Sequence, residues 1–328
     1  MGIELASLPR LPDALLEAAA VNNLVPFVGA GASMLAGCVS WAGLASKAID
    51  SLVQEKALSA LQRSQLAHLP PRLKLSLAEI TAREKRIQIP YREILQPDGW
   101  SDHKDGRRIY GHLGAISSQF VTTNYDGWLD INVPPAASTT AAVSISSPPL
   151  KRDVLYQRAD ISPAKFRSGS CVLHLHGSIA EPGSMILTTS DYISHYAADR
   201  DRVGGDGENP VLSFLSFLFS TRTVLFLGYG LEELEILEYV ILKSRSTKAR
   251  IPGARHFIVQ GFYSIEADLC RSLAKYYEEW GVTLIPFLRD DNDWAQLIDV
   301  VDYIARSLPT SREPALATFA DMKRMLHG

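Results

Sequence analysis

The chain has 328 residues, of which 46% are hydrophobic, and a formal net charge of −3 at pH 7. This length suits one large α/β domain with insertions or two modest domains. The small negative charge gives no reason to expect direct nucleic-acid binding, because nucleic-acid-binding proteins usually present a basic face.

The cysteines and the apolar stretches predict a cytoplasmic protein without a membrane segment. The three cysteines are odd in number and far apart, which fits a reducing compartment and gives no disulfide framework. No signal peptide is predicted, because residues 1–25 contain no apolar core of sufficient length. The longest apolar stretch, residues 211–228, contains Arg222, so it predicts a buried helix followed by a buried strand.

In chain order, the first predicted elements are a helix over residues 11–22 and a strand over residues 24–28. Pro12 falls in the first turn of this helix, and Asp13 lies near its positive end. Pro26 interrupts the strand, and proline is tolerated in a sheet only near an edge or at the start of a strand.

Residues 41–119 form a mostly helical stretch with leucine and alanine at helical spacing, broken by several prolines. The stretch is too long for a single crossover, so it predicts a helical insertion within one domain that spans residues 1–328. Residues 312–328 are predicted to form a short helical tail.

Strands and helices alternate through the rest of the chain. Strands are predicted over residues 120–123, 171–176, 223–227, 256–260 and 282–287, helices over 232–244 and 265–280, and long loops over 132–150 and 198–210. This alternation predicts an α/β fold: a Rossmann-like, doubly wound parallel sheet with an inserted helical subdomain.

Three short patches follow predicted strands and carry the residues suited to chemistry. They are Val28-Gly29-Ala30-Gly31-Ala32-Ser33, Thr122-Thr123-Asn124-Tyr125-Asp126 and Leu173-His174-Leu175-His176-Gly177-Ser178. In an open parallel sheet, ligands bind at the carboxyl ends of the strands. A glycine turn, an amide beside a carboxylate, and a histidine at a strand end together suggest a nucleotide-cleaving site.

Each patch alone also permits a purely structural interpretation. Glycine after a strand allows close approach of a pyrophosphate, but the third glycine of a dinucleotide fingerprint is missing. A tight turn that binds no ligand is therefore the alternative interpretation of this patch. Asn124 and Asp126 are residue types common in turns. His174 and His176 alternate along the predicted strand, so they are expected on one face; His176, before Gly177, is better placed to meet a ligand. A structural histidine remains the alternative.

Taken together and in this order, the patches resemble the sirtuin family. The glycine-alanine-glycine turn with its serine, the Thr-x-Asn-x-Asp patch and His176-Gly177 match the motifs that surround NAD in that family. The segments Met185-Ile186-Leu187-Thr188-Thr189-Ser190-Asp191-Tyr192 and Leu227-Gly228-Tyr229-Gly230-Leu231-Glu232 look like signatures of a bacterial sirtuin-like branch found in antiviral defence. The resemblance covers residues 24–290.

The resemblance implies hydrolysis of NAD to nicotinamide and ADP-ribose, as the effector of an antiphage defence system that depletes NAD. It implies that Asn124 orients water or a ribose hydroxyl, that His176 is the general base, and that Asp126 braces the loop or favours positive charge. The implied NAD-binding residues are Gly29, Ala30, Gly31, Ala32, Ser33, Thr123, Gly228, Tyr229 and Gly230. Sirtuin deacylases hold zinc in two CxxC pairs, which this chain lacks, so no zinc is predicted.

Two alternative functions stay open. One is an NAD-dependent protein deacylase or ADP-ribosyltransferase. The missing cysteine pairs argue against the deacylase. The other is a non-catalytic module that senses NAD or ADP-ribose. Because an NAD-depleting enzyme must be controlled, a homo-oligomer or a separately encoded partner is expected, and the family offers a HerA-type ATPase as a precedent.

Overall fold

The computed structural model describes residues 5–131, 133, 152–196, 209–230 and 256–309. Within these residues, seven strands form a single sheet. The strands are β1 (Leu24–Val28), β2 (Gln119–Thr122), β3 (Asp153–Leu155), β4 (Cys171–His174), β5 (Thr223–Leu227), β6 (His256–Phe262) and β7 (Val282–Leu288).

Helices connect and cover these strands. Those described are α1 (Asp13–Ala20), α2 (Ala30–Leu35), α3 (Trp41–Gln54), α4 (Ala60–Leu66), α5 (Pro71–Lys85), α6 (Tyr91–Leu95), α7 (Lys104–Ile116), α8 (Pro163–Arg167), α9 (Thr189–Tyr196), α10 (Pro210–Thr221), α12 (Ala267–Glu279) and α13 (Gln296–Ser307). The sequence predicted β1 and β5 with these bounds, but it missed the three-residue strand β3 and extended β4 by two residues. The predicted helix 232–244, tail 312–328 and most of the two long loops lie outside the described residues.

The order of the strands across the sheet is β3-β4-β2-β1-β5-β6-β7, and every neighbouring pair is parallel. Helices α1, α7 and α13 pack on one face, and α8, α10 and α12 pack on the other. Alternate residues of β1 enter the two cores: Leu24 and Val28 on one side, Val25 and Phe27 on the other. Both faces are therefore buried, as all-parallel sheets require, and the predicted doubly wound α/β fold is confirmed.

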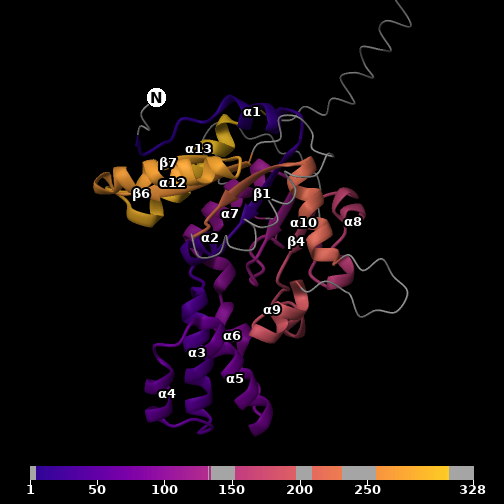
Figure 1. Cartoon of the computed structure of the whole chain (residues 1–328), viewed down its shortest axis with the longest axis vertical. Helices are drawn as coiled ribbons and strands as arrows, with labels where there is room; N and C mark the ends of the chain where they lie inside the picture. Colours follow the sequence, from indigo (N-terminus) through magenta and orange to yellow (C-terminus); the bar gives the residue numbers. More distant parts are fainter. Residues whose placement is uncertain (1–4, 132, 134–151, 197–208, 231–255, 310–328) are drawn as a thin grey trace, which may run out of the picture.

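Helices α3 to α6 project from the sheet and share a hydrophobic core of their own (Figure 1). We call residues 41–95 the helical module. Its longest helices start at defined signals: the Ser40 hydroxyl accepts a hydrogen bond from the Gly43 N–H at 3.1 Å, and Pro71 occupies the first position of α5. Helix α7 instead packs against the sheet, with Ile109 and Leu113 in the core beside β1 and β2. The helices within residues 41–119 therefore fall into two groups: α3 to α6 share the core of the helical module, and α7 packs against the sheet.

The apolar stretch over residues 211–228 is a helix followed by a strand, α10 and β5, as predicted. Asn209 caps α10 through its side-chain oxygen, which accepts hydrogen bonds from the N–H groups of Val211 and Leu212. In the part of the chain that the structure describes, no helix has both the length and the apolar character needed to cross a bilayer.

The expectation that Pro26 marks an edge strand is wrong, because β1 lies in the middle of the sheet between β2 and β5. The reason is local. The Asn23 carbonyl oxygen accepts a hydrogen bond from the Thr223 N–H, and the Gly29 N–H donates to the Leu227 carbonyl oxygen. The odd-numbered residues of this strand therefore face β5, and because neighbouring residues of a strand face opposite sides, the nitrogen of Pro26 faces β2. The pairing with β2 covers only Phe27 and Val28, so the missing N–H of Pro26 costs the sheet no ladder bond.

The loops that leave β1 and β5 touch through backbone atoms. The Gly31 N–H donates to the Gly228 carbonyl oxygen at 2.8 Å, and Gly228 has a φ of +70°. A Cβ on Gly228 would lie 2.6 Å from the Ala32 nitrogen, and one on Gly29 would lie 2.7 Å from the Tyr229 ring. Glycine is therefore required at both positions by close approach, and at Gly228 also by conformation.

Gly228→Ala should lower the free energy of unfolding by about 2–4 kcal/mol, through left-handed backbone strain and overlap with the facing loop. Urea denaturation measures the change. Gly230→Ala is the matched control, because a Cβ there has open space around it. Equal stability of the two variants would show that the two loops do not need this contact.

Candidate functional site

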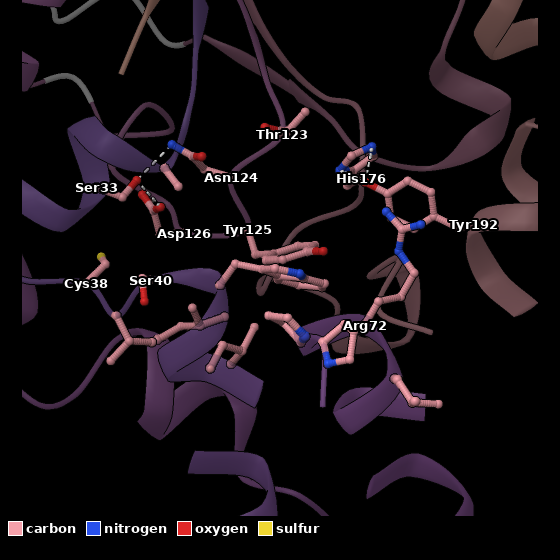
Figure 2. A pocket seen from close by; sticks show the side chains of 18 of the residues that line it. Ser33, Cys38, Ser40, Arg72, Thr123, Asn124, Tyr125, Asp126, His176 and Tyr192 are labelled. Atoms are coloured by element: carbon pink, nitrogen blue, oxygen red, sulfur yellow. Dashed lines mark hydrogen bonds between the residues drawn. The ribbon is translucent and has the colours of Figure 1, made fainter. Parts of the chain in front are cut away.

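A cavity of about 540 Å³ lies at the carboxyl edge of the sheet, between the strand ends and the helical module (Figure 2). The strand side of its wall consists of Ala30, Ser33, Thr123, Asn124, Tyr125, Asp126 and His176. The facing side consists of Cys38, Val39, Ser40, Trp41, Leu44, Pro70, Pro71, Arg72, Leu73 and Leu95, together with Thr189 and Tyr192 of α9. Its volume lies in the range of small-molecule sites.

The structure brings six of the predicted site residues to this one cavity. They are Ala30, Ser33, Thr123, Asn124, Asp126 and His176. The other predicted residues lie behind the wall or beside it: Gly29, Gly31 and Gly228 form the loop contact, Ala32 belongs to the buried core, Tyr229 is buried, and Gly230 is exposed. The carboxyl ends of β1, β2 and β4 meet here because the strands are adjacent and parallel.

Three backbone amides of the glycine turn already have acceptors within the protein. Gly29 N–H donates to the Leu227 carbonyl oxygen at 2.8 Å, Gly31 N–H to Gly228 at 2.8 Å, and Ala32 N–H to Gly29 at 3.2 Å. A phosphate group would reach these amides only in competition with those bonds. Their role as pyrophosphate donors stays a prediction.

A buried hydrogen-bond network centres on Ser33. Its hydroxyl donates to Asp126 Oδ2 at 2.6 Å and lies 3.0 Å from the Tyr110 hydroxyl, while Asn124 Nδ2 donates to it at 2.8 Å. A serine hydroxyl has one hydrogen and two lone pairs. Since that hydrogen goes to Asp126, Tyr110 must be a donor, and the hydrogen-bonding capacity of Ser33 is filled.

Asn124 has a fixed amide orientation. Its Nδ2 also donates to the Gly29 carbonyl oxygen at 2.9 Å, and a carbonyl can only accept, so the amide nitrogen must lie on that side. The side-chain oxygen points away from Ser33 (Figure 2). Asn124 therefore offers the cavity an acceptor and keeps its donors for the protein.

Asp126 stabilises the loop that follows β2. One oxygen accepts from Ser33, and the other accepts from the Trp128 N–H at 3.2 Å. Burial raises the pKa of this carboxyl above its ordinary value, although the hydrogen bonds from Ser33 and Trp128 oppose the shift. Its contacts fit a bracing role.

The two neighbouring histidines have different surroundings, and the expectation that both project from one face of a strand is wrong, because β4 ends at His174. His174 lies in the interior, with Nδ1 at 2.8 Å from the Asn124 carbonyl oxygen and Nε2 at 2.8 Å from Asp130 Oδ1. Burial alone would lower the pKa of His174, but Asp130 and Asn124 raise it overall. Both partners accept, so the protonated imidazole suits this site.

His176 instead lines the cavity, with its ring among the aromatic residues of α9. The Tyr196 hydroxyl lies 2.7 Å from its Nε2, and the Tyr192 hydroxyl lies 3.4 Å from the same atom. Burial, and then the nearby His195 and Arg72, lower the pKa of His176 to about 3. At neutral pH His176 is therefore an uncharged imidazole, the form in which a histidine can accept a proton.

Sequence reasoning missed the residues that complete the wall from the helical module and α9. Arg72, Trp41 and Tyr196 carried no recognisable motif, whereas Tyr192 belongs to a segment that the family resemblance had already marked. The rings of Trp41 and Tyr125 pack against each other in a tilted arrangement, with ring centroids 5.9 Å apart. Only the fold could place these side chains near His176.

The cysteines do not come together. Cys38 lies in the cavity wall, Cys171 begins β4 and Cys270 lies in α12, and all three are buried. Burial raises the pKa of each thiol. Within the described ranges, no three histidine, cysteine, aspartate or glutamate side chains gather as metal ligands would.

Comparison with known proteins identifies the class. A model of the SIR2-like domain matches residues 118–285, which is more than half of the chain. The protein therefore belongs to the SIR2-like domain family, and this membership implies that it binds NAD. The match includes Asn124, Asp126 and His176, whereas β1, its glycine turn and the helical module precede it.

A particular relative is the NAD(+) hydrolase ThsA of Bacillus cereus (strain MSX-D12). The two sequences are 26% identical over 239 residues, which is 72% of this chain and 42% of that protein. The chain therefore aligns with less than half of the length of this relative. The family and the relative together suggest an NAD-related enzyme activity.

The buried histidines should make folding sensitive to acid. His195 is 5% exposed, its Nε2 has no hydrogen-bond partner among the described residues, and burial lowers its pKa to about 4. The unfolded chain then binds protons more readily than the folded one, so stability is lost as pH falls from about 6.5 toward 4, by about 1.4 kcal/mol per pH unit for each such histidine.

Urea denaturation of His195→Gln between these pH values should therefore give a shallower loss of stability than the parent. His68→Gln is the control, because His68 is exposed on the helical module and its replacement should preserve the pH dependence of the parent. The same slope in parent and His195→Gln would contradict the assignment.

Proposed function

We propose that this protein hydrolyses NAD to nicotinamide and ADP-ribose. The observation that carries the proposal is the pairing of an uncharged His176 with the acceptor oxygen of Asn124 in one cavity at the carboxyl edge of the sheet. Membership of the SIR2-like family and similarity to an NAD(+) hydrolase support the same activity.

The reaction breaks the bond between the pyridinium nitrogen and C1′ of its ribose. The bonding electron pair goes to the ring nitrogen, so nicotinamide leaves neutral and needs no general acid. A water oxygen forms the new bond to C1′, and the water gives one proton to a base. The site must therefore supply a proton acceptor and groups that tolerate positive charge at C1′.

His176 is the proposed base. Its Nε2 is engaged by the Tyr196 hydroxyl, so a substrate hydroxyl or the attacking water has to replace that contact or share it. The lowered pKa of His176 keeps its imidazole unprotonated at neutral pH.

Asn124 is proposed to orient the attacking water or a ribose hydroxyl by accepting its hydrogen. The amide cannot turn, because both of its N–H bonds are used by Gly29 and Ser33. The oxygen dipole also favours the positive charge that develops at the ribose. Asp126 acts through Ser33 and the loop as a positioning residue rather than by touching the substrate.

Beyond the reaction, we propose that the protein is a cytoplasmic effector of an antiphage defence system, as its resemblance to that sirtuin-like branch implies. Its activity would then be held in check by self-assembly or by a separately encoded partner such as a HerA-type ATPase. We retain the prediction that it uses no zinc, because three separate buried cysteines supply no CxxC pair.

His176→Ala should reduce NAD cleavage by about 10²–10⁴-fold, the usual cost of losing a general base. The measurement is release of nicotinamide and ADP-ribose from NAD, separated by chromatography, with circular dichroism to establish folding. His68→Ala, at an exposed position, is the matched control and should retain the activity of the parent.

Other outcomes of this experiment would select a different function. Binding of NAD by the parent without cleavage would identify a sensor. Consumption of NAD only in the presence of an acetylated protein would identify a deacylase, and consumption only in the presence of a protein that accepts ADP-ribose would identify a transferase. A folded His176→Ala variant with the activity of the parent would refute the proposed base.

The helical module leaves large apolar side chains exposed, which supports assembly through its surface. Leu61 is 71% exposed and Ile80 43%. Light scattering should therefore report a mass well above the 36.1 kDa of one chain. Leu61→Ser should shift the mass toward the monomer. A parent protein that stays monomeric at all concentrations would contradict the proposal.

A further inference from the structure

The wall of the cavity that faces the sheet contains one positive charge. Arg72 lies in the first turn of α5, and it is the only arginine or lysine among the described residues that line the cavity. Figure 2 shows its side chain reaching from the helical module toward Tyr192 and the side where His176 lies.

Arg72 is held in place without being neutralised. Its guanidinium carbon lies 3.8 Å from the centroid of the Tyr192 ring, a cation–π contact. No carboxylate among the described residues forms an ion pair with it. Stacking occupies the flat face of a guanidinium and leaves the N–H groups at its edge for an anion.

Four of the groups expected to hold phosphate on the sheet side already have hydrogen-bond partners in the protein. The amides of Gly29, Gly31 and Ala32 donate to carbonyl oxygens, and the single hydrogen of the Ser33 hydroxyl goes to Asp126. A dinucleotide carries two phosphate charges, and among the described residues that line the cavity Arg72 is the cation that can meet them.

We propose that Arg72 binds the pyrophosphate of the substrate, so that the helical module contributes the anion-binding half of the site. This inference rests on the proposed NAD hydrolysis. Arg72 stacks on Tyr192, whose hydroxyl lies 3.4 Å from His176 Nε2. In NAD, the negative charge nearest to the scissile bond is the phosphate on the 5′-oxygen of the same ribose, so one molecule can meet both residues.

This assignment gives the helical module a function in substrate recognition. Residues 41–95 precede the part of the chain that matches the SIR2-like domain, so the family motifs do not include Arg72. Selectivity would then depend on an arginine and a tyrosine from different parts of the chain, α5 and α9, meeting across the cavity.

The test measures binding of ADP-ribose by calorimetry and cleavage of NAD by parent and variants. Arg72→Gln should weaken binding of ADP-ribose and raise KM for NAD by about tenfold or more, because loss of a charge-assisted hydrogen bond typically lowers affinity by that factor. The change in kcat should be smaller. Binding by the parent should weaken with ionic strength, and that dependence should be shallower in Arg72→Gln. Arg72→Lys should recover part of the affinity.

Arg83→Gln removes an exposed arginine from the last turn of the same helix and should behave as the parent does. Affinity and KM of Arg72→Gln within about threefold of an active parent would overturn the role of Arg72 and leave the proposed hydrolysis standing. A parent that neither binds ADP-ribose nor cleaves NAD would overturn both proposals.

Discussion

The architecture of the site depends on a backbone contact between the loops that leave β1 and β5. Gly31 donates to the carbonyl of Gly228 while the Cα atoms of the two loops approach too closely for side chains. This contact lies beside β1, where the order of the strands reverses. Strands β2, β4 and β3 lie on one side of β1, and β5, β6 and β7 lie on the other. Open α/β sheets bind ligands at such a reversal, and here the close fit fixes the first turn of α2 and therefore the position of Ser33.

Ser33 then ties three separate segments together. Its hydroxyl connects α2 to the loop after β2 through Asn124 and Asp126, and to α7 through Tyr110. Buried polar groups are costly unless they are paired, so the network stabilises one arrangement of the strand ends. The same pairing has a chemical consequence: donors that are paired with acceptors inside the protein are less available to a ligand, and the side-chain oxygen of Asn124 is left as an acceptor on this side of the cavity.

The helical module supplies the complementary side of the cavity. Its core extends beyond its own helices to Tyr125, Ile179 and Leu187, which follow β2 and β4. The module is therefore packed onto the strand ends rather than merely tethered to them, and Trp41 and Arg72 are held across from His176 and Asn124. Acceptors and a neutral base on one wall, and a cation with aromatic rings on the other, give the cavity the polarity of a site for an anionic, ring-containing ligand.

The sequence by itself determined six of the seven strands of the described sheet, because parallel strands buried on both faces are short apolar runs, and it determined that three polar patches would meet at one edge of the sheet. It also singled out Asn124, Asp126 and His176 through their position after those strands. It misjudged Pro26, whose tolerance depends on which neighbour its nitrogen faces, and it placed His174 and His176 on one face of a strand, although β4 ends at His174.

Only the tertiary structure decided which groups remain available for chemistry. The hydrogen-bond partners of Ser33, Gly29 and Gly31 from other parts of the chain lie 77 to 198 positions away, and Arg72 meets Tyr192 across 120 positions. No local periodicity encodes such pairs, because they arise from the packing of the module and α9 against the sheet. Whether a side chain that could bind a ligand is free to do so is a property of that packing.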